Sequence, residues 1–175
     1  GDLGADVIKV ERPGAGDDIR AVGPHFVNGE SVYFLSVNRN KRSVCIDLQR
    51  ERGREVLLDL ALNVDIVIEN FRAGVAERLG CDHTTLLAKN PRLIVCGITA
   101  FGRTGPDRDL PAFDLTLQAR GGVMSLTGEE GRAPVRCGVP IGDLAGGMFA
   151  SIAINAALFD RERTGRGRFI DLSLL

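Results

Sequence analysis

Short β-rich runs alternate with helix-like segments along this chain, and this alternation limits the possible fold more than any other feature. Residues 7–10, 43–48, 65–68 and 92–98 have strand character, and residues 169–175 begin a further strand. Between them, residues 49–62 place their apolar side chains on one helical face. Strands that alternate with helices favour parallel pairing. The sequence therefore predicts an α/β fold with an open, mostly parallel sheet and flanking helices.

The composition is that of a folded globular domain, and it does not identify a binding partner. The 175 residues are enough for one domain with a sizeable core, and 44% are apolar while 26% are charged. There are 22 Lys and Arg residues against 23 Asp and Glu, a net charge of −1. This balance provides no overall basic field for nucleic acid or for an anionic membrane. We expect neither as a partner.

The cysteines, histidines and apolar runs favour a reduced, cytoplasmic setting. Cysteines stand at positions 45, 81, 96 and 137 with no C-x-x-C pair, and His25 and His83 lie in unrelated segments. This spacing is not typical of a metal site, so we expect no metal and reduced thiols. No signal peptide is evident, and no apolar run is expected to approach the ~18 residues of a membrane span.

Ligands of open α/β sheets bind beyond the carboxyl ends of the strands. The residues that follow the predicted strands are Arg12, the Asn70–Phe71 pair and the Gly/Pro-rich loop 101–106, which is typical of a mobile loop. There is no G-x-G-x-x-G after the first strand and no G-x-x-x-x-G-K-[ST] in the chain. Neither a nicotinamide dehydrogenase nor a P-loop nucleotidase is supported.

Residues 138–148 join an extended apolar run to a long helical pattern, and they contain Asp143. An aspartate here is predicted to cap the helix, and the helix dipole would keep its carboxylate ionised. Gly142, Gly146 and Gly147 allow another group to approach the backbone closely. An ionised, accessible aspartate can also act as a nucleophile. The helix that follows is expected to be buried on nearly all sides, because its remaining faces are mostly Ala and Gly.

Six motifs occur in order along the whole chain. They are LGADVIKVE at 3–11, NRNKRS at 38–43, ENF at 69–71, NPR at 90–92, IGD at 141–143 and RERTGRG at 161–167. Taken together, they resemble the class III CoA-transferases of the CaiB/BaiF type. The resemblance implies a CoA-dependent enzyme with a Rossmann-like large domain in an interlocked homodimer of longer chains. Residues 1–175 would be part of that large CoA-binding domain, incomplete at both ends and without the small domain.

The resemblance also implies a reaction. Asp143 matches the family's catalytic aspartate, which attacks an acyl-CoA thioester to give an aspartyl-acyl anhydride and then an enzyme–CoA thioester. A small carboxylic acid then accepts the CoA. Coenzyme A is thus a substrate, and no tightly bound cofactor is expected. N–H groups near Gly142, Gly146 and Gly147 would stabilise the developing oxyanion. A glycine-rich loop beyond residue 175 would complete the site.

The CoA contacts implied by the resemblance are Arg12, Asn70, Phe71 and Arg78. Arginine suits phosphate, and an aromatic ring can stack on adenine. A CoA-contacting lysine of the family aligns with Gln49 here, so that contact is missing.

Each of these contacts has a plainer structural alternative. Phe71 is equally suited to a core position at a strand end, and Arg78 to an ion pair with Glu77 or Glu69. The basic cluster of Arg39, Lys41 and Arg42 can hold phosphates or simply face solvent.

Two alternative functions remain. The family also contains α-methylacyl-CoA racemases, which need a histidine in a His-Asp pair as a second acid/base group. The matching position is Phe113, before Asp114, and phenylalanine cannot carry a proton. The other alternative is a catalytically incomplete CoA-binding fragment in which Asp143 only caps its helix. Transfer of CoA is the favoured interpretation.

Overall fold

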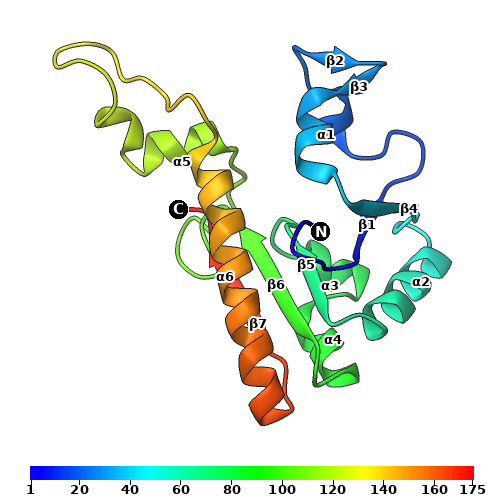
Figure 1. The fold of residues 1–175 in the computed structure, drawn as a ribbon. Helices are drawn as coiled ribbons and strands as arrows, with labels where there is room; N and C mark the ends of the chain where they lie inside the picture. The colour runs from blue at the N-terminus through cyan, green and yellow to red at the C-terminus, as the bar shows by residue number, and fades with distance from the viewer. The chain divides into compact units, whose positions relative to one another are not determined.

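The computed structural model describes residues 1–175, which form two compact units, residues 1–57 and residues 58–175 (Figure 1). Every strand pair is parallel except for one short hairpin. The expected α/β class with parallel pairing and flanking helices is confirmed. The strands are divided between the units, with one parallel sheet in each.

The first unit is built on two parallel strands, β1 (Val7–Glu11) and β4 (Lys41–Cys45). Parallel strands need a long crossover connection, and residues 12–40 provide it. The crossover contains η1 (Asp18–Ala21), the hairpin β2 (Phe26–Val27) and β3 (Glu30–Ser31), and α1 (Val32–Asn38). The side chain of Ser31 caps α1 by accepting a hydrogen bond from the Phe34 N–H (3.2 Å). The hairpin and α1 were not predicted from the sequence.

The second unit is built on three parallel strands in the order β5, β6 and β7. β5 is Ile66–Glu69, β6 is Ile94–Thr99 and β7 is Phe169–Ser173. The helices are α2 (Glu51–Leu62), which crosses the boundary between the units, α3 (Val75–Leu79), α4 (His83–Lys89), α5 (Asp114–Arg120), η2 (Val123–Ser125) and α6 (Ile141–Thr164). The strands and the helix expected over residues 49–62 are confirmed with small shifts at their ends.

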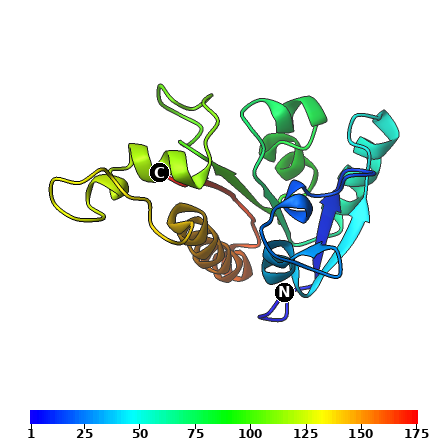
Figure 2. The same ribbon diagram turned by 90° about the horizontal axis from the view of Figure 1, so that it is seen from above.

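Helices cover both faces of this sheet, as Figure 2 shows for α6 on one side and α3 and α4 on the other. Side chains alternate across a strand, so neighbouring residues of β6 serve different cores. Val95 packs with Leu86 of α4, whereas Cys96 packs with Ala150 and Ile154 of α6. Both faces of the central strand are therefore buried, which explains its nearly continuous apolar sequence.

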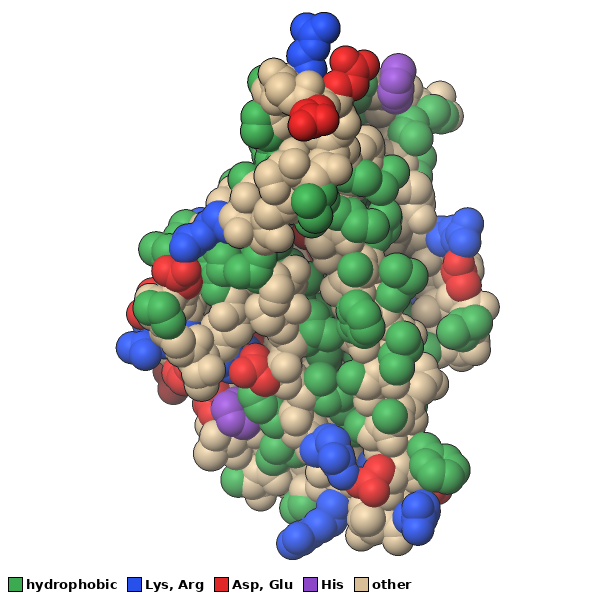
Figure 3. Space-filling view, turned by 90° about the vertical axis from the view of Figure 1, so that its left-hand side faces the viewer, with side chains coloured by type: hydrophobic (Ala, Val, Ile, Leu, Met, Phe, Trp, Pro, Cys, Tyr) green, Lys and Arg blue, Asp and Glu red, His purple; other side chains and the backbone are tan.

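Helix α6 buries one stripe, and its other faces are exposed. The buried residues are Gly146, Ala150, Ile154, Ala157 and Arg161. The large apolar side chains on the other faces are exposed, namely Leu144, Met148, Phe149, Ile152 and Phe159. Figure 3 views the side on which α6 lies and shows hydrophobic side chains gathered there. The expectation that this helix is buried on nearly all sides is wrong, because its small residues face the sheet and its large ones face outward.

The expectation that no apolar run approaches a membrane span also fails. Judged by length and composition alone, α6 is long and apolar enough to cross a bilayer. One such helix is weak evidence for a membrane span, because a helix that packs on a sheet can meet the same criterion. The buried stripe of α6 packs against β6 and β7.

Arg161 fastens the last part of α6 to the sheet. Its guanidinium donates to the backbone oxygen of Arg92 (3.2 Å) and to the carboxylate of Asp65 (2.9 Å). Arg92 lies just before β6, and Asp65 lies just before β5. The carboxyl end of α6 therefore lies at the amino ends of these two strands. The charge of Asp65 is exposed while the Arg161 side chain is buried.

We expect Arg161→Ala to lower the free energy of unfolding by about 2 kcal/mol, because it removes a buried packing group and the donor to the backbone oxygens of Asp65 and Arg92 and to the carboxylate of Asp65. Arg163→Ala removes an exposed arginine from the same turn and is expected to change stability by less than about 0.5 kcal/mol. Urea denaturation of both variants tests this. Equal losses for the two variants would contradict the anchoring role.

Candidate active site

Asp143 is the third residue of α6, and its side chain caps nothing. The N-cap position is Pro140, which offers no side-chain hydrogen bond. The carboxylate of Asp143 is exposed and accepts no hydrogen bond from the helix end. The expectation that Asp143 caps this helix is therefore wrong. Its carboxylate is left free of the role that most often explains an aspartate in this place.

The cap comes from another helix. Asp114, the first residue of α5, accepts hydrogen bonds at Oδ1 from the N–H groups of Gly142 (2.7 Å) and Asp143 (3.3 Å). Its Oδ2 accepts from the amide of Gln118, one turn further along α5. Gln118 is buried, and its Oε1 accepts from the N–H of Cys137 (2.7 Å). Asp114 and Gln118 thus hold both the loop that leads into α6 and the first turn of α6.

The surroundings of Asp143 raise the pKa of its carboxyl group above the ordinary value. Partial desolvation raises the pKa of the Asp143 carboxyl, and the nearby charge of Asp114 raises this pKa further. A helix N-terminus alone would lower it. A raised pKa makes the Asp143 carboxylate more basic than that of an ordinary surface aspartate.

The three glycines expected to permit close approach have different neighbours. A Cβ on Gly142 would lie 3.1 Å from Asp114 Oδ1, and one on Gly146 would lie 2.1 Å from Leu174 Cδ2. Gly147 faces open space. In this chain, Gly142 makes room for the capping carboxylate and Gly146 for the residue after β7. An oxyanion role for these glycines stays a prediction, and the N–H of Gly142 is already bonded to Asp114.

Asp143 lies at the carboxyl edge of the three-stranded sheet. Gly146, one turn after it, packs against Leu174, which directly follows β7. The opposite end of α6 is held near the amino ends of β5 and β6 by Arg161. The start of α6 therefore stands where ligands of parallel α/β sheets bind.

Three predicted CoA contacts follow β5 on this same edge. Asn70 is exposed, and Phe71 is half-buried with its N–H bonded to Glu69 Oε2 (2.8 Å). Arg78, in the last turn of α3, is exposed and forms no ion pair. The Glu69 carboxylate is held by Arg103 instead. Arg78 therefore forms no ion pair with Glu77 or Glu69, contrary to the structural alternative. Its guanidinium is available to an anion.

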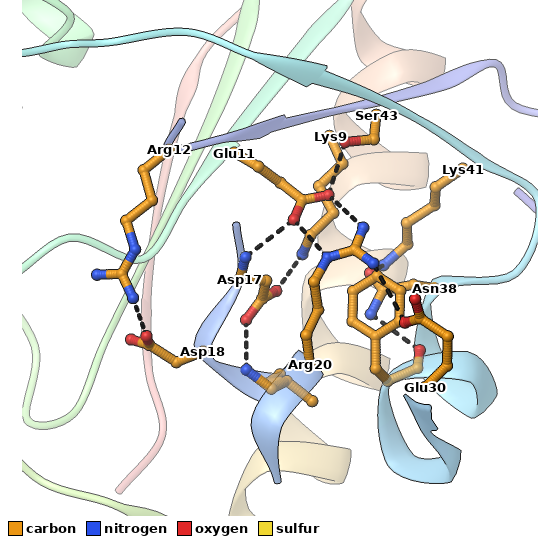
Figure 4. Close-up of polar contacts among 12 residues, drawn as sticks. Lys9, Glu11, Arg12, Asp17, Asp18, Arg20, Glu30, Asn38, Lys41 and Ser43 are labelled. Atoms are coloured by element: carbon orange, nitrogen blue, oxygen red, sulfur yellow. Dashed lines mark hydrogen bonds and ion pairs between the residues drawn. The ribbon is translucent and has the colours of Figure 1, made fainter. Parts of the chain in front are cut away.

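The fourth predicted contact, Arg12, lies in the first unit and pairs with the exposed Asp18. The residue before Arg12 is Glu11, which is buried at the end of β1 (Figure 4). Its carboxylate binds residues of the segment that follows β1. Glu11 accepts from Arg20 Nε (2.9 Å), from Ser43 Oγ (2.7 Å) and from the N–H of Asp17 (2.9 Å). Sequence reasoning missed this network.

The basic cluster in residues 39–42 is largely neutralised within the chain. Arg39 pairs with Asp2, and Arg42 pairs with Asp6. Lys41 donates to the side chain of Asn38 (3.2 Å). Both arginines of the cluster are therefore paired with carboxylates, which favours the solvent-facing interpretation of the cluster over a phosphate site.

The hydrogen bonds from Arg20, Ser43 and Asp17 lower the pKa of Glu11 to about 2. Its pKa is thus lower in the folded than in the unfolded state, so its stabilising effect is present above about pH 4.5 and is lost as pH falls toward 2. We expect Glu11→Gln to lower stability at pH 7 by roughly 1–2 kcal/mol, since solvent screens the partly exposed Arg20. The deficit should shrink between pH 4.5 and pH 2.

Melting temperatures measured across this pH range for the parent and the variant test the prediction. Glu30→Gln, which removes the more distant and exposed carboxylate partner of Arg20, is the control and should show almost no deficit. A Glu11→Gln deficit that is constant with pH would contradict the assigned ionisation.

Two alternative chemistries, racemisation and metal catalysis, depend on residues that can be located in the structure. Phe113 lies directly before α5 and is 85% exposed, so the position that a racemase would fill with histidine carries a solvent-facing phenyl ring. No group of three or more His, Cys, Asp or Glu side chains in residues 1–175 is arranged to hold a metal ion.

The fold and the site define an α/β protein with an accessible carboxylate at the carboxyl edge of a parallel sheet. A match to a known protein family identifies the class of protein more specifically. Residues 1–175 match the model of CoA-transferase family III, and the chain belongs to this family. The resemblance inferred from the six motifs is confirmed.

Named relatives agree with this placement. The chain is 49% identical to succinyl-CoA:glutarate CoA-transferase of Mus musculus over all of its residues and 40% of that protein. It is 45% identical to acetyl-CoA:oxalate CoA-transferase of Acetobacter aceti over 99% of this chain and 44% of that protein. A crystal structure of a CAIB/BAIF family protein from Brucella suis matches with a TM-score of 0.94 and 47% identity, covering 99% of this chain and 47% of that one. The chain spans less than half the length of each of these relatives.

Proposed function

We propose that the full-length protein transfers CoA from an acyl-CoA thioester to a free carboxylic acid, with Asp143 as the nucleophile. Membership of CoA-transferase family III and the names of the relatives support the class of reaction. The observation that carries the assignment to Asp143 is its exposed carboxylate, which makes no capping bond and stands in a first turn fixed by Asp114. A nucleophile needs this combination of accessibility and fixed position.

The proposed reaction proceeds by four acyl transfers. A carboxylate oxygen of Asp143 attacks the thioester carbonyl, the C–S bond breaks, and CoA leaves as a thiolate from an aspartyl-acyl anhydride. The thiolate attacks the Asp143 carbonyl, which releases the donor acid and leaves CoA as a thioester on Asp143. The acceptor carboxylate then displaces the CoA thiolate to form a second anhydride. Attack of the thiolate on the acceptor carbonyl gives the product and restores the carboxylate of Asp143.

The CoA nucleotide is proposed to bind Asn70, Phe71 and Arg78, with Arg12 as a further phosphate contact. The free guanidinium of Arg78 and its position after β5 support this, because an unpaired arginine offers several donors to a phosphate. The half-buried ring of Phe71, which also follows β5, provides an apolar surface for the adenine. Gly147 leaves open space on α6 for an approaching substrate.

We propose succinyl-CoA as the donor and a dicarboxylate as the acceptor. One relative is named for succinyl-CoA and glutarate and the other for acetyl-CoA and oxalate, so the two differ in donor while both named acceptors are dicarboxylates. CoA would act as a substrate, with no tightly bound cofactor.

The full-length protein is proposed to be a cytoplasmic, interlocked homodimer in which residues 1–175 belong to the large domain. The exposed apolar side chains of α6 support burial of this face in the assembly, since contiguous apolar surface marks interaction sites. Neither a membrane nor nucleic acid is proposed as a partner.

A matrix of acyl-CoA donors and carboxylate acceptors, assayed with the full-length protein, tests the proposed function. Formation of acceptor-CoA together with one equivalent of free donor acid is the expected result, with dicarboxylates preferred. Incubation of 2-methylacyl-CoA in deuterium oxide tests the racemase alternative in parallel. Deuterium at the α-carbon without transfer would replace the proposal by the racemase, whereas CoA binding without either reaction would leave only a CoA-binding protein.

A further inference from the structure

One row of residues crosses the three-stranded sheet near the carboxyl end of β5. Glu69, Gly97 and Asp171 are register partners on β5, β6 and β7. The two outer positions carry carboxylates, while the central one carries no side chain. This arrangement leaves a space between two negative charges above the middle strand.

Arg103, from the loop after β6, fills this space. Its Nη2 pairs with Glu69 Oε1, and its Nε lies 3.6 Å from Asp171 Oδ1. The guanidinium carbon also lies 5.2 Å from the centre of the Phe169 ring. The side chains are only 18% exposed for Arg103 and 8% for Glu69. The loop expected from its Gly/Pro content to be mobile is therefore tied to the sheet by a largely buried ion pair.

Gly97 is required for this arrangement. A Cβ at position 97 would lie 2.4 Å from Arg103 Nη2 and 2.8 Å from Glu69 Oε1. Both distances are shorter than ordinary Cβ contacts, so a side chain at position 97 would displace the ends of Arg103 and Glu69 from this pair. A glycine inside a central strand often marks such a close approach.

The second oxygen of Glu69 acts on a different segment. Oε2 accepts the N–H of Phe71 at 2.8 Å and so fixes the backbone directly after β5. One carboxylate therefore connects Arg103 of the loop after β6 with the backbone of Phe71 after β5. A charged acceptor makes a strong bond to a backbone N–H, provided that its own orientation is fixed.

We propose that Glu69 and Arg103 are positioning residues that hold the Asn70–Phe71 segment in its CoA-binding conformation. This inference rests on one part of the proposed function, namely the contact between Phe71 and CoA. Arg103 touches no substrate in this account. It fixes the carboxylate of Glu69, and the carboxylate fixes the Phe71 backbone.

Isothermal calorimetry of the full-length protein with free CoA provides a direct test. Arg103→Met keeps much of the side-chain volume but removes the charge that orients Glu69. We expect its dissociation constant for CoA to rise by about tenfold, while KM for the carboxylate acceptor stays within about twofold. Arg108→Met is the matched control, because Arg108 is an exposed arginine of the same loop that pairs only with its neighbour Asp109. It should leave CoA binding unchanged.

A double-mutant cycle separates positioning from general stability. If Arg103 acts through Phe71, Arg103→Met should have almost no further effect on CoA binding in a Phe71→Ala background. Glu69→Gln, a milder change that retains an oxygen for the Phe71 N–H, serves if Arg103→Met folds poorly and should weaken CoA binding less.

Additive effects of Phe71→Ala and Arg103→Met, or normal CoA binding by folded Arg103→Met or Glu69→Gln, would overturn the positioning proposal. A failure of the proposed function would give a different experimental result from a failure of the positioning proposal. The parent protein would then bind CoA and transfer none of it, and the cycle measured by calorimetry would still be informative.

Discussion

Asp143→Asn is expected to lower kcat for CoA transfer by about 10³-fold or more, because the amide cannot form the anhydride or the thioester intermediate. KM for the acyl-CoA should change little, since the nucleotide contacts lie on other elements. The side chain makes no capping bond, so the variant should also retain the stability of the parent. Steady-state kinetics and a melting curve of the full-length protein measure both effects.

Glu162→Gln is the matched control for this substitution. Glu162 is an exposed carboxylate near the other end of α6, and its only ion pair is a long contact with Arg92 (3.7 Å). Its replacement should leave kcat within about twofold of the parent. An Asp143→Asn enzyme with kcat near that of the parent would remove Asp143 from the mechanism.

The second large effect is expected at Asp114, which fixes the first turn of α6 without touching substrate. Asp114→Ala removes the acceptor for the N–H groups of Gly142 and Asp143. It also removes the carboxylate partner of the Gln118 amide, whose nitrogen then keeps only its long bond to the Val139 oxygen (3.4 Å). We expect kcat to fall by about 10- to 100-fold, because a small displacement of a nucleophile is costly to the rate. Loss of the cap should lower stability by about 1 kcal/mol.

Asp114→Asn separates the charge of Asp114 from its hydrogen bonds. Asparagine keeps one oxygen for the N–H of Gly142 but presents its NH₂ to the Gln118 amide, so a smaller loss of kcat is expected than with alanine. The like charge of Asp114 raises the pKa of Asp143, so removing that charge lowers this pKa.

The acid limb of kcat/KM reports the pKa of an essential base in the free enzyme. In Asp114→Asn it should therefore move to lower pH. A pH–rate profile recorded from acid to neutral pH tests the shift. An unchanged limb, or a shift to higher pH, would show that the limb does not report Asp143.

The alternation of strands and helices along the chain made the parallel α/β class predictable from the sequence. Local patterns do not report the hairpin at residues 26–31, because two-residue strands carry too little periodicity to be seen. The burial of α6 was misjudged for a related reason. Ala and Gly are compatible with any environment, so their position alone did not show that the sheet packs on the small residues and leaves Phe149 and Phe159 outside.

At the site, the sequence placed Asp143 at the start of a helix but assigned it the wrong hydrogen bonds. The true cap comes from Asp114, which is distant in sequence and reaches α6 only through tertiary structure. The Glu69–Arg103 pair was missed for the same reason. A partial signal was present, because Gly97 interrupts an otherwise apolar strand and so indicates a close approach.

Chemical trapping shows directly whether the side chain of Asp143 becomes covalently modified during CoA transfer. The full-length protein is incubated with succinyl-CoA and quenched with hydroxylamine or borohydride, and its peptides are analysed by mass spectrometry. We expect a donor-dependent hydroxamate or alcohol on the Asp143 side chain that is absent from Asp143→Asn. Active enzyme that transfers CoA with Asp143 unmodified, or with the adduct on another residue, would contradict this expectation.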